Sequence, residues 1–432
     1  MTLNNTYSYR FSLVRVAVLA GLFVLLVLGF MPSRASASDQ TFVPDPNYTS
    51  IAAAPNGGFW VQLHGMKDYE WDFRTIAIDG APMFESIPAF GSIAAIPGKN
   101  GYWMVRPSGD IYARGEAPQL CGGRLQNCSG FSTTDPKRIT AAAASPNGKG
   151  LWAVDNKGHV WTAGDVVSYG DVSRDGSTPT GIVPTPSGKG YYIVCEDGGV
   201  HGRGDAVLFG STGGHKPGGH NITGIALSYN LFGEVNGYWL VGSDGGVHSF
   251  GNAPFLGSTG GAPGGHQVSS IVSRPDGRSY AWVYRNGKVE YSREPSPVVI
   301  QSVTEGKVID VSNGSPEQAP LKLAPASGSA SQKWKLVPYN SAFKMVNVNS
   351  SLCMDLEYGA ASGRVIQYPC KQEPNPTNQL WKLVKDESGA AQFYALEQSE
   401  YRLYGYPEEM DAGLIVSYYT NPGLSWTVTA VP

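Results

Sequence analysis

The sequence has little charge and lacks the common catalytic signatures. Each of these shortages argues against a class of function or structure. Charged residues make up 16% of its 432 residues and the formal net charge is −3, so no basic surface invites nucleic acid. Beyond residue 40, no long stretch repeats its apolar residues at helical spacing. The motifs GxSxG, HExxH and Walker A are missing as well. These absences favour a non-helical protein whose partners are neutral.

The residues that are abundant point to β-structure. The chain holds 55 glycines, 23 tyrosines and 10 tryptophans, a composition typical of short strands joined by tight turns. Its length allows two or three domains, each large enough to bury an interior. We therefore expect an all-β protein with two folded parts.

The N-terminus has the layout of a secretory signal. Arg10 and Arg15 precede an apolar run from Val16 to Met31, and small residues follow up to Ala37. We expect residues 1–37 to be a signal peptide cleaved after Ala37, and the protein to be secreted, either extracellular or cell-wall associated. The length of the run also allows an uncleaved anchor, which is the one membrane association that the sequence suggests.

The five cysteines divide into two close pairs and one single residue. Export permits disulfides, so we predict one bond between Cys121 and Cys128 and another between Cys353 and Cys370. Cys195 lies in a strand-like apolar run, where a buried thiol that packs as a small hydrophobe is favoured over a nucleophile.

Residues 42–297 repeat a short aromatic segment at a period of about forty to fifty residues. A second landmark follows the aromatic pair in most copies, as in Gly115-Glu116-Ala117 and Gly204-Asp205-Ala206. Six copies of the aromatic segment occur, at Gly58-Phe59-Trp60-Val61, Gly101-Tyr102-Trp103-Met104-Val105, Gly150-Leu151-Trp152-Ala153-Val154, Gly190-Tyr191-Tyr192-Ile193-Val194, Gly237-Tyr238-Trp239-Leu240-Val241 and Ser279-Tyr280-Ala281-Trp282-Val283.

A unit of this length with several short strands cannot bury both faces alone and must stack on its neighbours. The repeats therefore predict a β-propeller over residues 42–297, with six blades and seven as the alternative count. The repeat wording, especially in 237–247, resembles that of secreted actinobacterial proteins predicted to be β-propellers, a likeness that implies no agreed activity. We expect the recurring valines to pack inside: Val105, Val154, Val194, Val241 and Val283.

Two histidines suggest a metal site but are better explained as scaffold. His201 and His248 occupy the same position of adjacent units, and Tyr112, Trp161 and Glu290 take that position in other units. A metal site needs ligands that converge. We predict no metal and no other cofactor.

Catalysis by the repeat region is the main alternative hypothesis. Glycoside hydrolysis needs two carboxylates about 5–10 Å apart, and several repeat-region acids qualify by type. Most of them are repeat landmarks, so we predict no catalytic residue and keep a polysaccharide-acting glycoside hydrolase with a catalytic propeller as the alternative. The candidate acids are Asp72, Asp79, Glu116, Asp165 and Asp205.

From residue 299 a different threefold pattern begins. Gln332-Lys333-Trp334, Gln379-Leu380-Trp381 and a degraded Leu424-Ser425-Trp426 are spaced by forty-odd residues. These endings resemble those of the ricin-type β-trefoil lectins, whose three subdomains each close with Gln-X-Trp. The resemblance implies a β-trefoil over residues 299–432 that binds carbohydrate.

The middle subdomain holds the residue types that a neutral sugar requires. Vicinal hydroxyls need an acceptor such as Asp355 and amides such as Gln367, Asn378 and Gln379, while the apolar face needs a ring such as Tyr368. By resemblance, Asp355 bridges two hydroxyls, Asn378 and Gln379 add or orient hydrogen bonds, and Tyr368 stacks. Ile366-Gln367-Tyr368-Pro369 is one residue shorter than the family pattern, which places the stacking role of Tyr368 in question. The alternative is a trefoil scaffold whose sugar site has lapsed.

The other two subdomains lack parts of this set. In the first, Asp310 is present, but Lys322 stands at the Gln367 position and Ala324 near the stacking position. In the third, Tyr404 or Gly405 falls where the aspartate belongs. One working site is therefore expected.

The sequence predicts a secreted, non-catalytic, lectin-like protein that attaches to extracellular or cell-wall polysaccharide. Its partner would be a neutral glycan with galactose-, xylose- or arabinose-type units, whose hydroxyl pairs are similar. A cell-wall adhesion protein without sugar preference is a third interpretation, next to the hydrolase.

Overall fold

The computed structural model describes residues 42–44, 50–67, 70–84, 91–132, 138–172, 177–261, 267–311, 317–339, 342–357, 363–371, 377–396, 402–405, 414–417 and 425–431. The predicted signal segment 1–37 lies outside these ranges. Within them, no helix is both long enough and apolar enough to cross a membrane.

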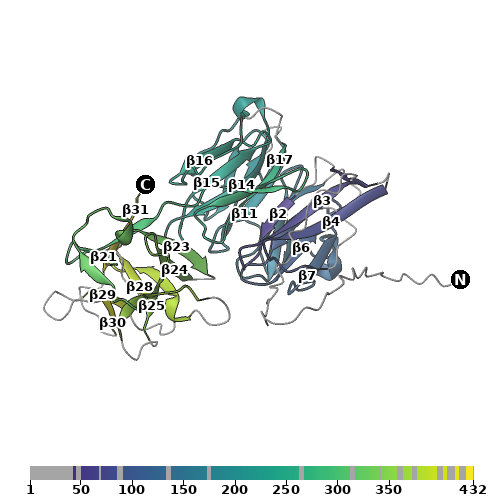
Figure 1. The fold of residues 1–432 in the computed structure, drawn as a ribbon. Coiled ribbons are helices and arrows are strands. Elements are labelled where there is room, and N and C mark those ends of the chain that lie inside the picture. The colour runs from purple at the N-terminus through teal and green to yellow at the C-terminus, as the bar shows by residue number, and fades with distance from the viewer. Residues whose placement is uncertain are drawn as a thin grey trace, which may run out of the picture. The chain divides into compact units, whose positions relative to one another are not determined.

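The described residues are almost entirely strands and turns, so the predicted all-β class is confirmed (Figure 1). Among the described residues, α1 (Gln126–Ser129) is the one α-helix, and there are also four short 3-10 turns. These turns are η1 (Cys121–Gly123), η2 (Pro217–Gly219), η3 (Ala330–Gln332) and η5 (Thr377–Gln379).

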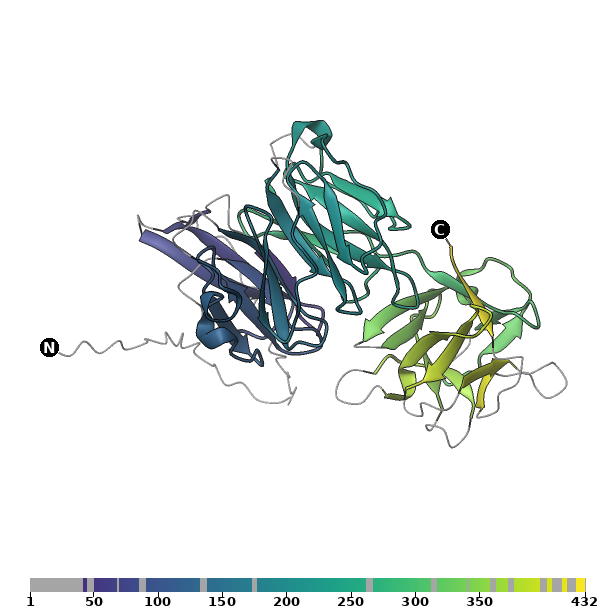
Figure 2. The same ribbon diagram turned by 180° about the vertical axis from the view of Figure 1, so that it is seen from behind.

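Each of the six aromatic repeats forms the central strand of its own small antiparallel sheet (Figures 1 and 2). The first sheet has four strands and the other five have three. In the first sheet β3 (Phe59–Lys67) pairs with β1 (Phe42–Pro44), β2 (Ser50–Ala53) and β4 (Glu70–Ile78). In sheet order, the strands of the other five are β5 (Ser92–Ala95), β6 (Gly101–Val105) and β7 (Ile111–Gly115); β8 (Ile139–Ala144), β9 (Gly150–Asp155) and β10 (Val160–Gly164); β11 (Pro179–Pro184), β12 (Gly190–Cys195) and β13 (Val200–Gly204); β14 (Ile222–Tyr229), β15 (Val235–Gly242) and β16 (Val247–Gly251); β17 (Val268–Ser273), β18 (Tyr280–Tyr284) and β19 (Val289–Tyr291).

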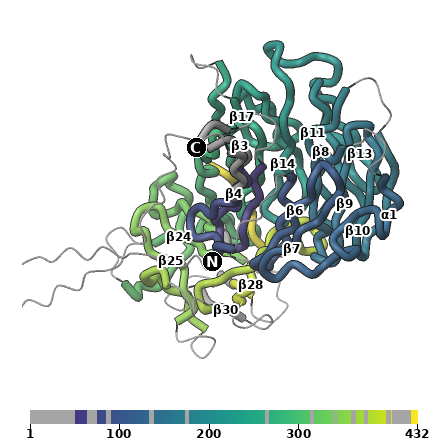
Figure 3. The backbone as a smooth tube through the Cα atoms, turned by 90° about the vertical axis from the view of Figure 1, so that its right-hand side faces the viewer, coloured from purple at the N-terminus to yellow at the C-terminus, as the bar shows by residue number. Residues whose placement is uncertain are grey.

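In each sheet, the strand that directly precedes the aromatic central strand in the chain is called its beginning strand, and these six strands contact one another in a closed series. β2 contacts β5, and the contacts continue through β8, β11, β14 and β17, which returns to β2. Figure 3 shows β6 and β7 beside β9 and β10, whose facing side chains share one apolar cluster. The series closes through apolar contact as well, because Phe59 and Val61 of the first sheet pack with Ala281 and Val283 of the last. The five recurring valines are all buried, as predicted.

Small residues let the six beginning strands approach closely. An added Cβ at Gly181 would lie 3.2 Å from Ile225 of β14, and one at Gly224 would lie 3.2 Å from the backbone nitrogen of Ile271 in β17. Ser50, Ser92 and Ser270 take the corresponding register position in three other sheets. The glycine, serine and alanine content of these strands is thus a requirement of the packing between sheets.

In several of the repeats, a hydrogen bond joins the two sequence landmarks. The buried indole of Trp103 donates to the Pro118 carbonyl, just after Gly115-Glu116-Ala117, at 2.8 Å. Trp152 reaches the Val167 carbonyl and Trp239 the Pro254 carbonyl in the same way, at 2.8 and 2.7 Å. Because a buried indole N–H needs an acceptor, the tryptophan and the landmark depend on each other.

The tyrosine of the aromatic pair links one unit to the preceding one. The Tyr191 hydroxyl accepts from the Tyr169 amide at 3.0 Å and donates to the Gly170 carbonyl at 2.8 Å. Tyr280 makes the same pair of bonds with the backbone at positions 256 and 257. Burial raises the pKa of Tyr280 to about 12, so its hydroxyl keeps the proton that it donates.

The C-terminal part is a β-trefoil, as predicted: a closed six-stranded barrel with three hairpins. The barrel strands, in order, are β20 (Val298–Ser302), β23 (Trp334–Tyr339), β24 (Ala342–Asn347), β27 (Trp381–Lys385), β28 (Ala391–Ala395) and β31 (Trp426–Ala430). The hairpins pair β21 (Val308–Asp310) with β22 (Lys322–Ala324), β25 (Cys353–Leu356) with β26 (Val365–Tyr368), and β29 (Arg402–Gly405) with β30 (Leu414–Ser417). Residues 292–297, which include Pro295 and Pro297, connect β19 to β20.

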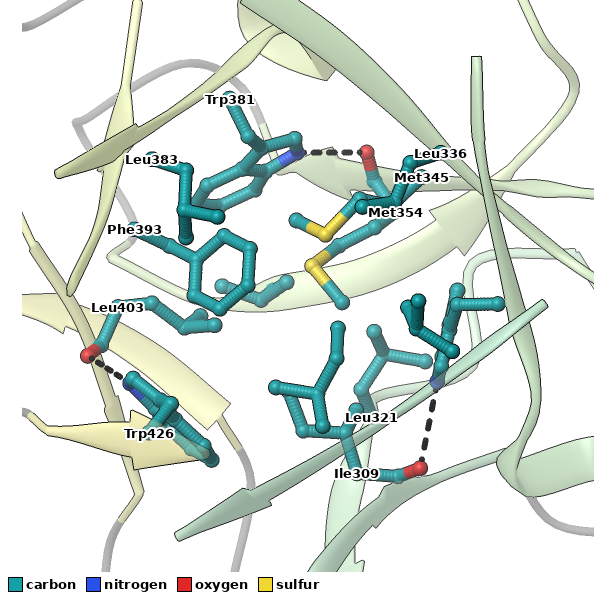
Figure 4. Close-up of a cluster of buried hydrophobic side chains, with 14 of the residues drawn as sticks. Ile309, Leu321, Leu336, Met345, Met354, Trp381, Leu383, Phe393, Leu403 and Trp426 are labelled. Atoms are coloured by element: carbon teal, nitrogen blue, oxygen red, sulfur yellow. Dashed lines mark hydrogen bonds between the residues drawn. The ribbon is translucent and has the colours of Figure 1, made fainter. Parts of the chain in front are cut away.

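Three buried tryptophans give the trefoil its threefold core (Figure 4). Each indole donates to the carbonyl of a hairpin residue in its own subdomain. Trp334 bonds Ile309 at 3.3 Å, Trp381 bonds Met354 at 3.1 Å and Trp426 bonds Leu403 at 3.2 Å. The Trp of Gln-X-Trp therefore holds the hairpin in place and belongs to the core.

We predict that Tyr191→Phe lowers stability by about 1–3 kcal/mol, because it leaves the Tyr169 amide and the Gly170 carbonyl without their hydroxyl partner. Urea unfolding of the full chain measures the change. Tyr394→Phe is the matched control, since the Tyr394 hydroxyl donates to a glutamine side chain two residues away on the same strand and so makes a local bond. Equal midpoints for both variants would show that the link contributes nothing.

Candidate functional site

The predicted sugar-binding segment folds into the middle hairpin of the trefoil. Strand alternation separates its side chains, so that Cys353 and Asp355 share one face while Met354 and Leu356 face the core cluster. The disulfide between Cys353 and Cys370 ties the hairpin to the segment that follows it, and the second predicted bond, between Cys121 and Cys128, is also confirmed. Cys195 lies outside both disulfides and is buried, as predicted.

Asp355 lies at the centre of a polar cluster with two of the predicted residues. The Asn378 amide donates to its Oδ1 at 2.8 Å, and the Gln379 amide donates to its Oδ2 at 2.8 Å. Both donors lie in the short turn η5, whose last residue, Gln379, is the first residue of the Gln-X-Trp signature. The structure thus brings Asp355, Asn378 and Gln379 together as the sequence suggested.

Gln379 also fixes the backbone around the site. Its amide donates to the Pro369 carbonyl at 2.9 Å, and its Oε1 accepts from the Lys371 backbone amide at 2.8 Å. Its side chain is fully buried. The position of Gln379 therefore fits an orienting role behind Asp355.

A lysine that the sequence analysis did not consider completes the cluster. The Lys371 ammonium lies 2.8 Å from Asn378 Oδ1, 3.5 Å from Asp355 Oδ2 and 5.5 Å from the centre of the Tyr368 ring. The Asp355 side chain is only 4% exposed, against 37% for Lys371. The ammonium thus contacts the acceptor, the amide and the ring that a sugar would use. The lysine follows Cys370 directly, so the disulfide was the one signal that could have drawn attention to it.

Gln367 and Tyr368 point to opposite sides of the hairpin. Gln367 pairs with Met354 in register and is fully buried, which places it on the core face, away from the Asp355 cluster. Tyr368 pairs with Cys353, on the face of Asp355, and is half-buried. Of the predicted residues, Tyr368 therefore contacts the Asp355 cluster through Lys371. Gln367 lies on the other face and is not part of the cluster.

The first subdomain repeats the scaffold of the site without its sugar-binding additions. The Gln332 amide donates to Asp310 at 3.0 Å and to the Pro325 carbonyl at 2.9 Å, as Gln379 does for Asp355 and Pro369. Ser327 takes the backbone position of Lys371. The aspartate–glutamine bond is therefore common to both subdomains.

The register in the first subdomain corrects one assignment. Lys322 pairs with Asp310, the position of Ile366, and Leu323 pairs with Ile309, the position of Gln367. The expectation that Lys322 stands at the Gln367 position was wrong by one residue. Ala324 pairs with Val308, as Tyr368 pairs with Cys353, so the stacking position holds alanine as expected.

The third subdomain has no aspartate at the corresponding place. Trp426 bonds the Leu403 carbonyl as Trp381 bonds that of Met354, so Tyr404 is the counterpart of Asp355. This resolves the choice between Tyr404 and Gly405. Leu424 lies outside the described residues.

The acids considered for catalysis have structural partners where their side chains are described. Asn100 donates its backbone amide to Glu116 at 2.7 Å, and Thr185 donates its hydroxyl to Asp205 at 2.7 Å. The Tyr291 hydroxyl donates to Asp79. Asp165 is exposed on a repeat turn, and the side chain of Asp72 lies outside the described part.

The described residues contain no group of three or more His, Cys, Asp or Glu side chains that could hold a metal ion. His201 and His248 take equivalent register positions in neighbouring sheets, opposite Ile193 and Leu240. Burial lowers the pKa of His248, although Asp244 acts against it. A buried position is consistent with a scaffold role for that histidine.

Residues 281–369 match a family model described as ricin-type beta-trefoil lectin domain-like. The matched range contains Asp355 and ends just after β26, before Asn378 and Gln379. It begins inside β18, whose sheet partners are β17 and β19. No curated protein sequence matches the chain.

Several solved structures are similar to about a third of the chain. The designed threefold-symmetric protein ThreeFoil is 26% identical, with 31% of this chain and 99% of that chain covered and a TM-score of 0.28. A ricin B-like lectin of Macrolepiota procera in complex with lactose is 17% identical, with coverages of 32% and 97% and a TM-score of 0.27. A mutant of the earthworm lectin C-terminal domain in complex with 6'-sialyllactose is 14% identical, with coverages of 32% and 100% and a TM-score of 0.26.

We predict that replacing Cys353 and Cys370 with serine destabilises the trefoil by about 3 kcal/mol, because the bond closes a loop of 17 residues. Hydrogen exchange of the β25 and β26 amides in the full chain should accelerate. The double serine variant of Cys121 and Cys128 is the control and should leave these amides unchanged. Unaltered exchange in the first variant would show that the bond does not hold the hairpin.

Proposed function

We propose that this protein binds carbohydrate through the middle subdomain of its trefoil. The observation that carries the proposal is the Asp355 cluster, in which a carboxylate, two amides and a neighbouring ring meet in a domain that matches a lectin-like family. The ligand is a neutral glycan with galactose-, xylose- or arabinose-type units. Asp355 accepts from two sugar hydroxyls, Asn378 adds a hydrogen bond and Tyr368 covers the apolar face of the ring.

The Lys371 ammonium makes contacts that the bound sugar would make. Its ammonium donates to Asn378, as a hydroxyl would, and rests over Tyr368, as the C–H face of a sugar would. A bound sugar therefore displaces the ammonium from Asp355. The flexible stem of lysine lets the charge move to solvent while its apolar part stays packed.

The residues outside the trefoil suggest how the binding site is presented. We propose a secreted protein in which the six small sheets are the blades of a propeller and the trefoil anchors the protein to polysaccharide. A closed series of six beginning strands and an apolar closure between first and last sheets support the propeller.

Asp355→Asn should abolish glycan binding, because it removes the negative acceptor while preserving size. A glycan array probed with the full chain measures the loss, and its dense display compensates for a weak single site. Asp310→Asn is the matched control, since Asp310 makes the same bond to a Gln-X-Trp glutamine but lacks the neighbouring ring. If no glycan signal depends on Asp355, the lectin proposal fails. Release of reducing ends from polysaccharide by the full chain would favour the hydrolase instead.

Lys371→Met should strengthen neutral-sugar binding several-fold, because methionine keeps an apolar stem but cannot donate to Asp355 or Asn378. Titration calorimetry with the best glycan of the array gives the affinity. Lys382→Met, on an exposed residue of β27, is the control for loss of one positive charge. Weaker binding by Lys371→Met alone would mean that the ammonium contacts the sugar directly.

A further inference from the structure

The six beginning strands enclose a cavity of about 1370 Å³. Its wall is formed by residues of β2, β5, β8, β11, β14 and β17. Cavities that bind small molecules typically measure about 300–1,000 Å³, so this one has room for a ligand of several sugar units. All residues that line the cavity belong to the six small sheets or to the segments between their strands, so the cavity is separate from the trefoil site.

Two arginines lie at one end of the cavity, and Arg285 Nη1 donates to Gln267 Oε1 at 2.9 Å, which uses one of the several N–H groups of its guanidinium. Arg138 precedes β8 and Arg285 follows β18, and both line the cavity together with His220 and Asn221. Backbone hydrogen bonds show that both arginines lie at the same end, where the beginning strands start. The Asn156 amide donates to the Arg138 carbonyl at 2.8 Å, and the Arg285 amide donates to the Gln267 carbonyl at 2.8 Å.

Among the described residues, basic side chains outnumber acidic ones at this end. None of the described residues that line the cavity is aspartate or glutamate. Glu196 stands nearby, where its carboxylate accepts from the Asn221 amide at 3.1 Å, and it sets one negative charge against the two arginines. The lining at the opposite end is uncharged and includes Pro55, Pro97 and Pro275. The cavity therefore favours an anionic group at one defined end.

The wall between the ends is suited to hydroxyl groups. Each beginning strand pairs with only one strand of its own sheet among the described residues, so its second edge presents backbone N–H and C=O groups. Thr140, Thr180 and Thr223 add hydroxyls that donate to carbonyls of their own sheets and retain acceptor capacity. An apolar ligand would leave these groups unsatisfied.

We propose that this cavity is a second binding site, which takes an acidic oligosaccharide with its carboxylate at the end marked by Arg138 and Arg285. Guanidinium groups bind carboxylates with charge-assisted hydrogen bonds, and the strand edges and threonines bind the sugar hydroxyls. The two arginines stand on the third and sixth sheets of the series, so they reach the ligand from different sides. The site is independent of the trefoil cluster and does not rest on it.

The test is titration calorimetry of the full chain with trigalacturonate, and with maltotriose as a neutral trisaccharide. Trigalacturonate should bind, more weakly as salt rises, and maltotriose should bind at least about tenfold more weakly. The double variant Arg138→Gln, Arg285→Gln should lose at least about tenfold in affinity. Arg124→Gln, on an arginine that is 66% exposed and faces Asp110, is the control and should bind normally.

Further variants separate the remaining explanations. Arg138→Lys, Arg285→Lys keeps the charge and should retain part of the affinity, which guards against a folding defect in the glutamine pair. Asp355→Asn should bind trigalacturonate as the unaltered protein does. The proposal is overturned if trigalacturonate does not bind, if the glutamine pair binds it normally, if Asp355→Asn abolishes binding, or if inorganic phosphate competes as well as the trisaccharide.

Discussion

The need to satisfy buried indole N–H groups organises both halves of this protein. A buried tryptophan contributes a large apolar surface, but its N–H must find an acceptor. In the small sheets Trp103, Trp152 and Trp239 reach a backbone carbonyl just past the third strand, which fixes where the chain leaves the sheet. In the trefoil Trp334 and Trp381 reach back to the hairpin strand instead. The residue after the accepting carbonyl is Asp310 in the first subdomain and Asp355 in the second, so the same bond that completes the core also sets the position of the proposed binding residue.

This coupling explains why much of the architecture can be predicted from the sequence. Aromatic repeats mark central strands because an indole and its acceptor recur together, and Gln-X-Trp marks a barrel strand because Trp381 and Gln379 each hold a fixed partner. Side-chain direction is harder, because a shift of one residue turns a strand side chain to the other face. That is how Lys322 came to be assigned to the position that Leu323 holds, and why the burial of Gln367 on the core face was not foreseen.

Contacts between units were also beyond the sequence analysis. The hydroxyl of Tyr191 bonds the backbone of the preceding unit, and no pattern within one repeat indicates where that backbone lies. The same holds for Lys371, whose ammonium meets Asp355 and Tyr368 only because the disulfide and the Gln379 bonds curl the segment after β26 back over the hairpin. Residue types predict which side chains a site contains, whereas the path of the chain in three dimensions determines which of these side chains meet.

The aspartate in the trefoil serves scaffold and site at once, and the two subdomains that keep it show how these roles divide. Asp310 and Asp355 both accept from a Gln-X-Trp glutamine, so this bond cannot be the mark of a binding site. What distinguishes the middle subdomain is the addition of Asn378 on Oδ1 of the carboxylate, Lys371 beside Oδ2, and the Tyr368 ring next to the ammonium. The ammonium offsets the cost of a nearly buried negative charge while no ligand is present. A sugar must therefore replace both its hydrogen bonds and its charge, and hydroxyl groups replace only the first. In the proposed trefoil site, the strength of this internal competitor would therefore limit affinity, and Lys371 alone would set that limit.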